Sequence, residues 1–211
     1  MKEDEDDDED DFEMNLPNKL TVSRFVLTAL FLWALFSPFR FNDTLALILF
    51  SLAGFTDFLD GRIARKRKLI SNFGILMDPL ADKILICSAF IALVESTHRN
   101  ANAPVTVEAW MVIVIVAREL TITGLRLLAA SKNIVLAAEN FGKHKAVSQI
   151  VAINALLVLD ACNEWPAGLQ HFFLSWVPLL AKIMLWVAVA LTAASGAIYL
   201  WRNRAIYMSE T

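Results

Sequence analysis

Cysteine and histidine are scarce in this chain, which has two of the first and three of the second among its 211 residues. Cys87 and Cys162 lie in or beside apolar segments, so no disulfide framework or paired-cysteine zinc site is available. We expect both to be small buried hydrophobic residues. The histidines are scattered and show no metal-ligand spacing. These absences exclude disulfide-stapled scaffolds and zinc enzymes of the H-E-x-x-H type.

Charged residues are also few, at 19% of the chain, whereas hydrophobic residues make up 57% and the mean hydropathy is +0.52. An average soluble domain is about 45–50% apolar and about 25% charged. The composition therefore predicts a protein solvated by the lipid bilayer, and nucleic acid is not among its expected partners.

The formal net charge of −3 hides an uneven distribution. Residues 1–13 carry ten acidic side chains and one lysine, which leaves 18 basic and 12 acidic residues for the rest of the chain. Such a block of like charges predicts a disordered tail, although Met14 leaves a different start site or an upstream extension open. No signal-peptide pattern is present. We expect an acidic tail over 1–13, a membrane domain over 14–204 and a short C-terminal tail over 205–211.

Six apolar stretches are long enough to cross a bilayer, which requires about 20 residues in a helix. The clearest runs for 19 residues without a charge, from Ile183 to Trp201. No alternation of period two, as in a β-barrel, competes with this pattern. The sequence therefore predicts an all-α, polytopic membrane protein with six transmembrane helices. These cover residues 19–37, 43–66, 74–95, 105–130, 143–161 and 172–201.

Basic residues gather on one side of this predicted topology. They follow the second span, flank the connection between the fourth and fifth spans, and follow the sixth span, whereas the opposite loops carry chiefly Arg40 and Arg99. Short loops rich in lysine and arginine stay in the cytoplasm. We therefore expect a multi-pass protein of the cell membrane with both termini cytoplasmic.

Four aspartates, Asp57, Asp60, Asp78 and Asp82, interrupt the second and third predicted spans. Each would cost about 2.5–3.5 kcal/mol at mid-membrane, so they must face a polar cavity, each other or cations. On a helix, Asp57 and Asp60 share one face, as do Asp78 and Asp82. Asp78 and Pro79 could instead open a helix as its N-cap and first residue, but this alternative does not account for Asp82.

Carboxylate oxygens suit hard divalent cations, and two Mg²⁺ or Mn²⁺ ions would balance four ionised groups. A two-metal carboxylate site is typical of phosphoryl chemistry. Gly61 would let a ligand approach the backbone closely, and Arg65 offers positive charge to an anionic substrate or lipid head group. The basic residues 66–68 could be no more than a topological anchor, and Gly74 could simply loosen a helix start.

Together these residues resemble the signature of the CDP-alcohol phosphatidyltransferase family, D-x2-D-G-x2-A-R-x8-G-x3-D-x3-D. The chain matches all eight fixed positions, with Asp57, Asp60, Gly61, Ala64, Arg65, Gly74, Asp78 and Asp82. The resemblance implies an integral membrane enzyme of six transmembrane helices, usually a homodimer. Such an enzyme transfers a phosphatidyl group from CDP-diacylglycerol to an alcohol and releases CMP.

The resemblance also implies roles for individual residues. The metal-binding set would be Asp57, Asp60, Asp78 and Asp82, and Asp82 would in addition act as the general base. The set that contacts CDP-diacylglycerol would be Thr21, Gly61, Ala64, Arg65 and Gly74.

Residues 15–24, 117–126 and 142–149 resemble bacterial family members that use glycerol 3-phosphate, with one departure at Ala146, where threonine is usual. An acceptor that carries a phosphate needs cations beyond the metals. The candidates are Arg118, Arg126, Lys143 and Lys145. Each could instead anchor the topology, and Arg118 could form a structural ion pair with the adjacent Glu119.

The expected activity is therefore phosphatidyl transfer to glycerol 3-phosphate, at a site that faces the cytoplasm. Another acceptor, namely phosphatidylglycerol, serine or inositol phosphate, stays open. From a different class, a divalent-cation-binding transporter or a membrane scaffold also stays open, although no internal repeat of the transporter kind is visible.

Overall fold

The structure is a computed structural model that describes residues 16–67, 72–100, 103–132 and 141–204. Every regular element in these ranges is a helix, as the sequence predicts. The elements are α1 (Leu16–Phe36), α2 (Asn42–Arg67), α3 (Asn72–Arg99), α4 (Ala109–Ser131), α5 (Phe141–Ala161), the short 3-10 helix η1 (Cys162–Glu164), α6 (Ala167–Leu174) and α7 (Val177–Arg202). The predicted tails 1–13 and 205–211 lie outside the described residues.

Within the part of the chain that the structure describes, two helical segments, Lys145–Glu164 and Val177–Arg202, are long and apolar enough to cross a membrane. Val22–Phe36 and Asn42–Thr56 are apolar but shorter. Charged residues at one end of α2 and in the first turns of α3 reduce the apolar length of these helices. These are the segments that carry the aspartate motif.

The predicted sixth span is wrong at its start. Residues 172–174 belong to α6, and a new helix begins at Val177 with Pro178 in its first turn. Proline is tolerated there because the first helical N–H groups have no partner within the helix. The predicted fourth span also begins too early, since α4 starts at Ala109. Before it, the backbone N–H of Val107 donates to the hydroxyl of Thr97 at 3.1 Å rather than to a helical carbonyl.

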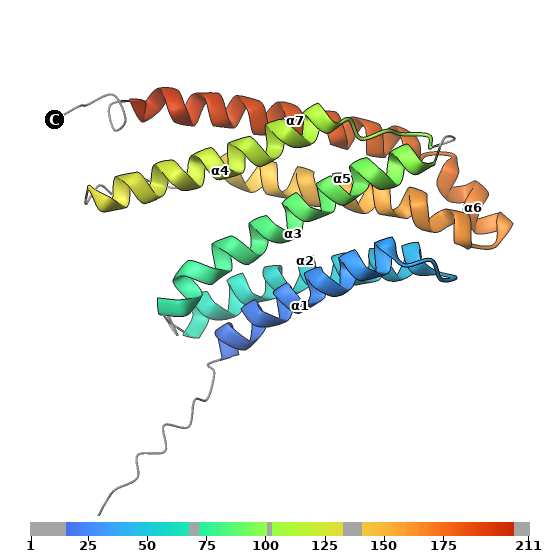
Figure 1. Cartoon of the computed structure of the whole chain (residues 1–211), viewed down its shortest axis with the longest axis horizontal. Coiled ribbons are helices and arrows are strands. Elements are labelled where there is room, and N and C mark those ends of the chain that lie inside the picture. Colours follow the sequence, from blue (N-terminus) through green and yellow to red (C-terminus); the bar gives the residue numbers. More distant parts are fainter. Residues whose placement is uncertain (1–15, 68–71, 101–102, 133–140, 205–211) are drawn as a thin grey trace, which may run out of the picture.

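Figure 1 shows the long helices lying side by side, with successive helices running in opposite directions. The most extensive contacts are those of α1 with α2 and of α5 with α7. At the left of Figure 1, α2 ends, α3 begins and α4 and α7 end. We call this the motif end, because both halves of the aspartate motif lie there. The α1–α2 and α3–α4 connections and α6 lie at the opposite, far end.

Many small side chains lie at the helix contacts, and large apolar side chains cover the outside. Fully buried alanines include Ala34, Ala46, Ala89, Ala152 and Ala181. Exposed hydrophobic residues include Trp33, Ile113, Leu120, Leu179 and Trp201. Small residues let membrane helices approach closely, and an apolar outer surface of this extent suits lipid rather than water.

Glu164 joins the far end of the bundle to the start of α2. Its carboxylate accepts hydrogen bonds from the backbone N–H groups of Asp43 at 3.0 Å and of Thr44 at 2.9 Å. The hydroxyl of Thr44 donates to the same carboxylate at 2.5 Å and accepts from Trp165 Nε1 at 3.0 Å. A residue from η1 therefore satisfies N–H groups that the first turn of α2 leaves without helical partners.

Replacing Glu164 by alanine removes this cap and leaves two backbone donors without an acceptor. We expect Glu164→Ala to lower the free energy of unfolding by about 1–2 kcal/mol, measured by thermal unfolding of the purified protein in detergent. Glu108→Ala is the matched control, because Glu108 is exposed and makes no capping hydrogen bond at the start of α4. Equal midpoints for Glu164→Ala and the unmodified protein would contradict the role of the cap.

Candidate active site

The aspartate motif spans two helix ends. Asp57 and Asp60 lie in the last three turns of α2, and Asp78 and Asp82 lie in the first three turns of α3. Both helices are continuous through these positions, so each pair lies on one face of its helix, three or four residues apart. The side chains of these four residues lie outside the part of the chain that the structure describes.

The alternative in which Asp78 caps a helix is wrong. Helix α3 begins at Asn72, six residues before Asp78, so Asp78 and Pro79 lie inside it. Asp78 therefore has no capping role that would account for its presence. The proline that follows it removes one helical hydrogen bond and is unfavourable inside a helix. Gly74 is the third residue of α3. The alternative that this glycine simply loosens the start of a helix therefore stays open.

For the other residues expected to contact CDP-diacylglycerol, the structure gives only the helix on which each one lies. Gly61, Ala64 and Arg65 lie on α2, beyond Asp60, and Thr21 lies on α1. Their side chains, like that of Lys143 on α5, are outside the described part.

A charged cluster lies inside the bundle, between α4 and α5. The ammonium group of Lys145 forms an ion pair with the carboxylate of Glu119, and Arg118 Nη1 lies 3.4 Å from the same carboxylate. Glu119 is 7% exposed and Lys145 is 6% exposed. The ion pair between Arg118 and Glu119 that the sequence left open is therefore present, and it includes Lys145 as well.

Polar groups from two further helices extend this cluster. The ammonium group of Lys83, on α3, donates to the hydroxyl of Thr123, on α4. Gln149 Nε2, on α5, donates to the hydroxyl of Thr192, on α7, at 3.1 Å. A small cavity of about 30 Å³ is lined by Lys83, Glu119, Lys145, Gln149 and three neighbours. The cluster thus joins α3, α4, α5 and α7.

Sequence reasoning missed Lys83, Gln149 and Thr192, and it considered Glu119 only as the partner of Arg118. A signal was available, because ionisable residues within apolar spans usually face the interior and mark functional positions. The same signal applies to Arg24 on α1, which is 2% exposed.

The three predicted acceptor cations whose side chains the structure describes do not form one group. Arg118 and Lys145 meet at Glu119, whereas Arg126 lies eight residues further along α4, about 12 Å along the helix axis. There, Arg126 Nε donates to the hydroxyl of Tyr199 at 3.4 Å, and the guanidinium lies 5.8 Å from the centre of that ring. Arg126 is nearer to the motif end than Arg118, since α4 ends there.

Two contacts between helices show how the depth of the aspartate motif in the bundle compares with that of the charged cluster. The hydroxyl of Ser51, on α2, donates to Asn154, on α5, at 2.8 Å. Helices α2 and α5 run in opposite directions. Asp60 and Lys145 are the same number of residues from this contact along their own helices, so their backbones lie at about the same level. On α3, Asp82 directly precedes Lys83, which bonds to α4 one turn from Glu119. The aspartates and the charged cluster therefore lie at similar depths in the bundle.

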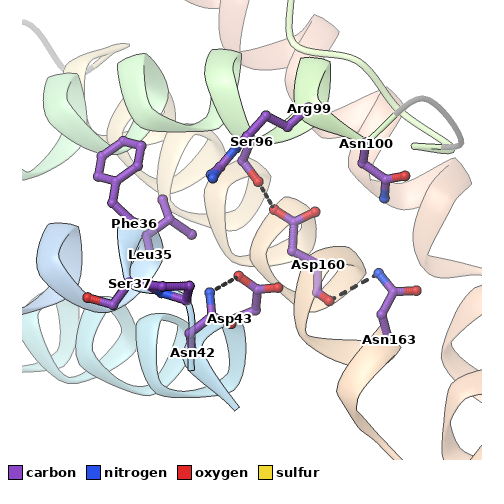
Figure 2. A pocket seen from close by; sticks show the side chains of 11 residues that line it. Leu35, Phe36, Ser37, Asn42, Asp43, Ser96, Arg99, Asn100, Asp160 and Asn163 are labelled. Atoms are coloured by element: carbon purple, nitrogen blue, oxygen red, sulfur yellow. Dashed lines mark hydrogen bonds between the residues drawn. The ribbon is translucent and has the colours of Figure 1, made fainter. Parts of the chain in front are cut away.

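A larger polar cavity, of about 460 Å³, lies at the far end (Figure 2). Residues from the end of α1, the start of α2, the end of α3, α5 and η1 line it, including Asp43, Arg99 and Asp160. Asp160 accepts a hydrogen bond from Ser96 at 2.7 Å, and Asn42 donates to Asp43 at 3.0 Å. None of the predicted site residues lines this cavity, so its size does not make it the catalytic site.

Gly196 makes room for Arg118. A β-carbon built at Gly196, on α7, would lie 2.8 Å from Cγ of Arg118. Arg118 therefore passes across α7 where that helix has no side chain, and its Nε is buried without a hydrogen-bond partner among the described residues. An unsatisfied buried donor of this kind is costly, which marks Arg118 as a place where a ligand oxygen would be accommodated.

The fold and the motif together define a helical membrane protein with a carboxylate-bearing candidate active site at one end. The chain belongs to the CDP-alcohol phosphatidyltransferase family, whose model matches residues 14–194. Family members are membrane enzymes that generally use divalent metal ions. Membership indicates that this chain is a phosphatidyltransferase.

Curated relatives cover nearly the whole chain, and three of them carry one name. A Bacillus subtilis protein is 40% identical over 201 residues, which cover 90% of this chain and 95% of the relative. Proteins of Rickettsia felis and Haemophilus influenzae are each 31% identical, covering 88% of this chain and 93% and 91% of their own lengths. All three are named CDP-diacylglycerol–glycerol-3-phosphate 3-phosphatidyltransferase.

The close approach at Gly196 allows a direct test. Gly196→Ala places a methyl group against the stem of Arg118, so that Arg118 must move, and we expect a loss of about 1–3 kcal/mol in the free energy of unfolding. Gly54→Ala is the control, because nothing lies within 4 Å of a β-carbon built there. Thermal unfolding of both variants in detergent checks this, and equal midpoints would show that Arg118 moves without cost.

Proposed function

We propose that this chain transfers the phosphatidyl group of CDP-diacylglycerol to glycerol 3-phosphate, giving phosphatidylglycerophosphate and CMP. The observation that carries the proposal is the relative from Bacillus subtilis, 40% identical over 90% of this chain and named for that reaction. The complete aspartate motif, the partly buried Arg118 and the buried Lys145 supply the chemistry that the reaction needs.

The proposed topology follows from the helices. Residues 14–204 form one membrane domain in which α1 to α5 and α7 cross the membrane, and both termini and the motif end face the cytoplasm. The surplus of basic residues at that end supports this orientation. It gives glycerol 3-phosphate, which is soluble in water, access from the cytoplasm, while CDP-diacylglycerol enters from the bilayer. We further propose that the enzyme is a homodimer in the cell membrane.

The donor set of the motif fits a divalent metal. The motif places four aspartates on two continuous helices at one end of the bundle, and hard oxygen ligands suit Mg²⁺ or Mn²⁺. Asp57, Asp60, Asp78 and Asp82 would hold two such ions. When bound, the ions would offset the negative charge of the pyrophosphate group of the donor.

The residues of the chain account for the remaining steps. Asp82 takes the proton of the acceptor hydroxyl. The oxygen then bonds to the phosphorus that bears diacylglycerol, the bond from that phosphorus to the CMP phosphate breaks, and CMP leaves with the bonding electron pair. No covalent intermediate with the enzyme is required.

Two groups of residues hold the substrates. The CDP-diacylglycerol head group contacts Gly61 and Arg65, with Thr21, Ala64 and Gly74 beside them. The phosphate of glycerol 3-phosphate is held by at least two of Arg118, Arg126, Lys143 and Lys145. The buried unsatisfied Nε of Arg118 supports its inclusion.

A panel of acceptors tests the proposed function. We expect the purified protein, given CDP-diacylglycerol and Mg²⁺ or Mn²⁺, to release CMP at a rate that rises with glycerol 3-phosphate. Phosphatidylglycerol, serine and inositol phosphate are the comparison acceptors. Stimulation by one of these and not by glycerol 3-phosphate would reassign the acceptor, and no CMP release with any alcohol would refute the activity.

The role of Asp82 makes a sharper prediction. Asp82→Asn removes the proposed base, so we expect kcat to fall by about 10²–10⁴ while the protein keeps its detergent elution profile and thermal midpoint. Asp43→Asn, the same change at the far end, should leave kcat within about twofold, because Asp43 lies in the first turn of α2, away from the motif. Turnover by Asp82→Asn near that of the unmodified enzyme would remove the base assignment.

A further inference from the structure

Glu119 is a buried acid at the centre of a cationic region. It lies on α4, is 7% exposed, and its carboxylate contacts the cations of both Lys145 and Arg118. Lys83 also lines the small cavity beside it. The hydroxyl of Thr123, to which Lys83 donates, is anchored in turn on the backbone carbonyl of Glu119 at 2.7 Å. Positive groups from α3, α4 and α5 are thus arranged around one carboxylate.

Stability alone does not explain such an arrangement. The cost of removing charges from water offsets most of the attraction in a buried ion pair, and apolar residues of similar volume often serve as well. What a buried carboxylate does provide is a fixed position for its partners. Lysine needs this more than arginine, because its ammonium is a point charge on a flexible four-carbon stem.

Two cations share the single negative charge of Glu119. Arg118, Glu119 and Lys145 therefore carry a net charge of +1 as a group. A phosphate dianion is therefore attracted to the group, while the carboxylate prevents the two cations from repelling each other out of position. Glu119 itself would repel a phosphate at short range, so the phosphate must approach the cations from another side.

We infer that Glu119 is a positioning residue for the acceptor, which holds Lys145 and Arg118 where they bind the phosphate of glycerol 3-phosphate. This inference rests on the proposed function. Glu119 does not touch the acceptor and takes no part in proton transfer. Its removal takes from Lys145 and Arg118 the carboxylate that they share, and the loss falls on acceptor binding rather than on the lipid donor.

Steady-state kinetics with Glu119→Gln test the inference, because the amide keeps the shape of the side chain and removes its charge. We expect the KM for glycerol 3-phosphate to rise about tenfold and the KM for CDP-diacylglycerol to change by less than about twofold. An unchanged KM for glycerol 3-phosphate, or an equal rise in both constants, would overturn the inference. Glu108→Gln is the matched control, since Glu108 is an exposed glutamate just before α4, and it should leave both constants unchanged.

A double-mutant cycle shows whether Glu119 acts through Lys145. In the Lys145→Gln background, Glu119→Gln should raise the KM for glycerol 3-phosphate by less than about twofold, because the group that it positions is gone. Independent, multiplying effects would refute positioning through Lys145.

Should Glu119→Gln not fold, Glu119→Asp supplies the same test. It keeps the negative charge but shortens the side chain by one methylene, which moves the carboxylate away from its partners. A rise of about threefold in the KM for glycerol 3-phosphate alone supports the inference, and no change overturns it. The proposed function fails separately, since an unmodified enzyme that releases no CMP with glycerol 3-phosphate refutes the reaction itself. Release with an unaltered KM in Glu119→Gln refutes only the role of Glu119.

Discussion

Ionised side chains in a bundle surrounded by lipid need partners of opposite charge or a polar cavity, and this constraint organises the structure. Lys145, Glu119 and Arg118 meet in the interior, and Lys83 reaches Thr123 across α3 and α4. These contacts tie together helices whose other contacts are made by small and apolar side chains. The aspartates of α2 and α3 lie at a similar depth, so the motif and the charged cluster share one level of the bundle.

The two ends of the bundle are built for different purposes. At the far end, Glu164 caps α2 and Asp160 holds Ser96, so the connections between helices are linked by hydrogen bonds from distant parts of the chain. At the motif end, aspartates lie inside the last turns of α2 and the first turns of α3, where they have no capping role. An enzyme that joins a lipid to a water-soluble acceptor gains from this division, since one end keeps the helices in place while the other carries the reacting groups.

Much of this was predictable from local patterns. The long apolar stretches predicted the helices, because backbone groups in lipid must be satisfied within each segment, and the motif spacing predicted which residues share a helix face. The errors came where local patterns are ambiguous. Asp78 and Pro79 look like a helix start, yet α3 begins at Asn72. The sixth apolar stretch looks continuous, yet it is divided between α6 and α7 near Pro178.

The sequence by itself determined the helical class, the motif and the family, because these depend on residue type and spacing along one chain. Tertiary structure decided which charges meet. Four cations looked equivalent in the sequence, but the packing of α4 and α5 against α3 and α7 joins Arg118 and Lys145 at Glu119 and leaves Arg126 beside Tyr199. It also set the passage of Arg118 over Gly196 and the cap of α2 by Glu164. Residues far apart in the sequence come together only through helix packing, and no local pattern records that geometry.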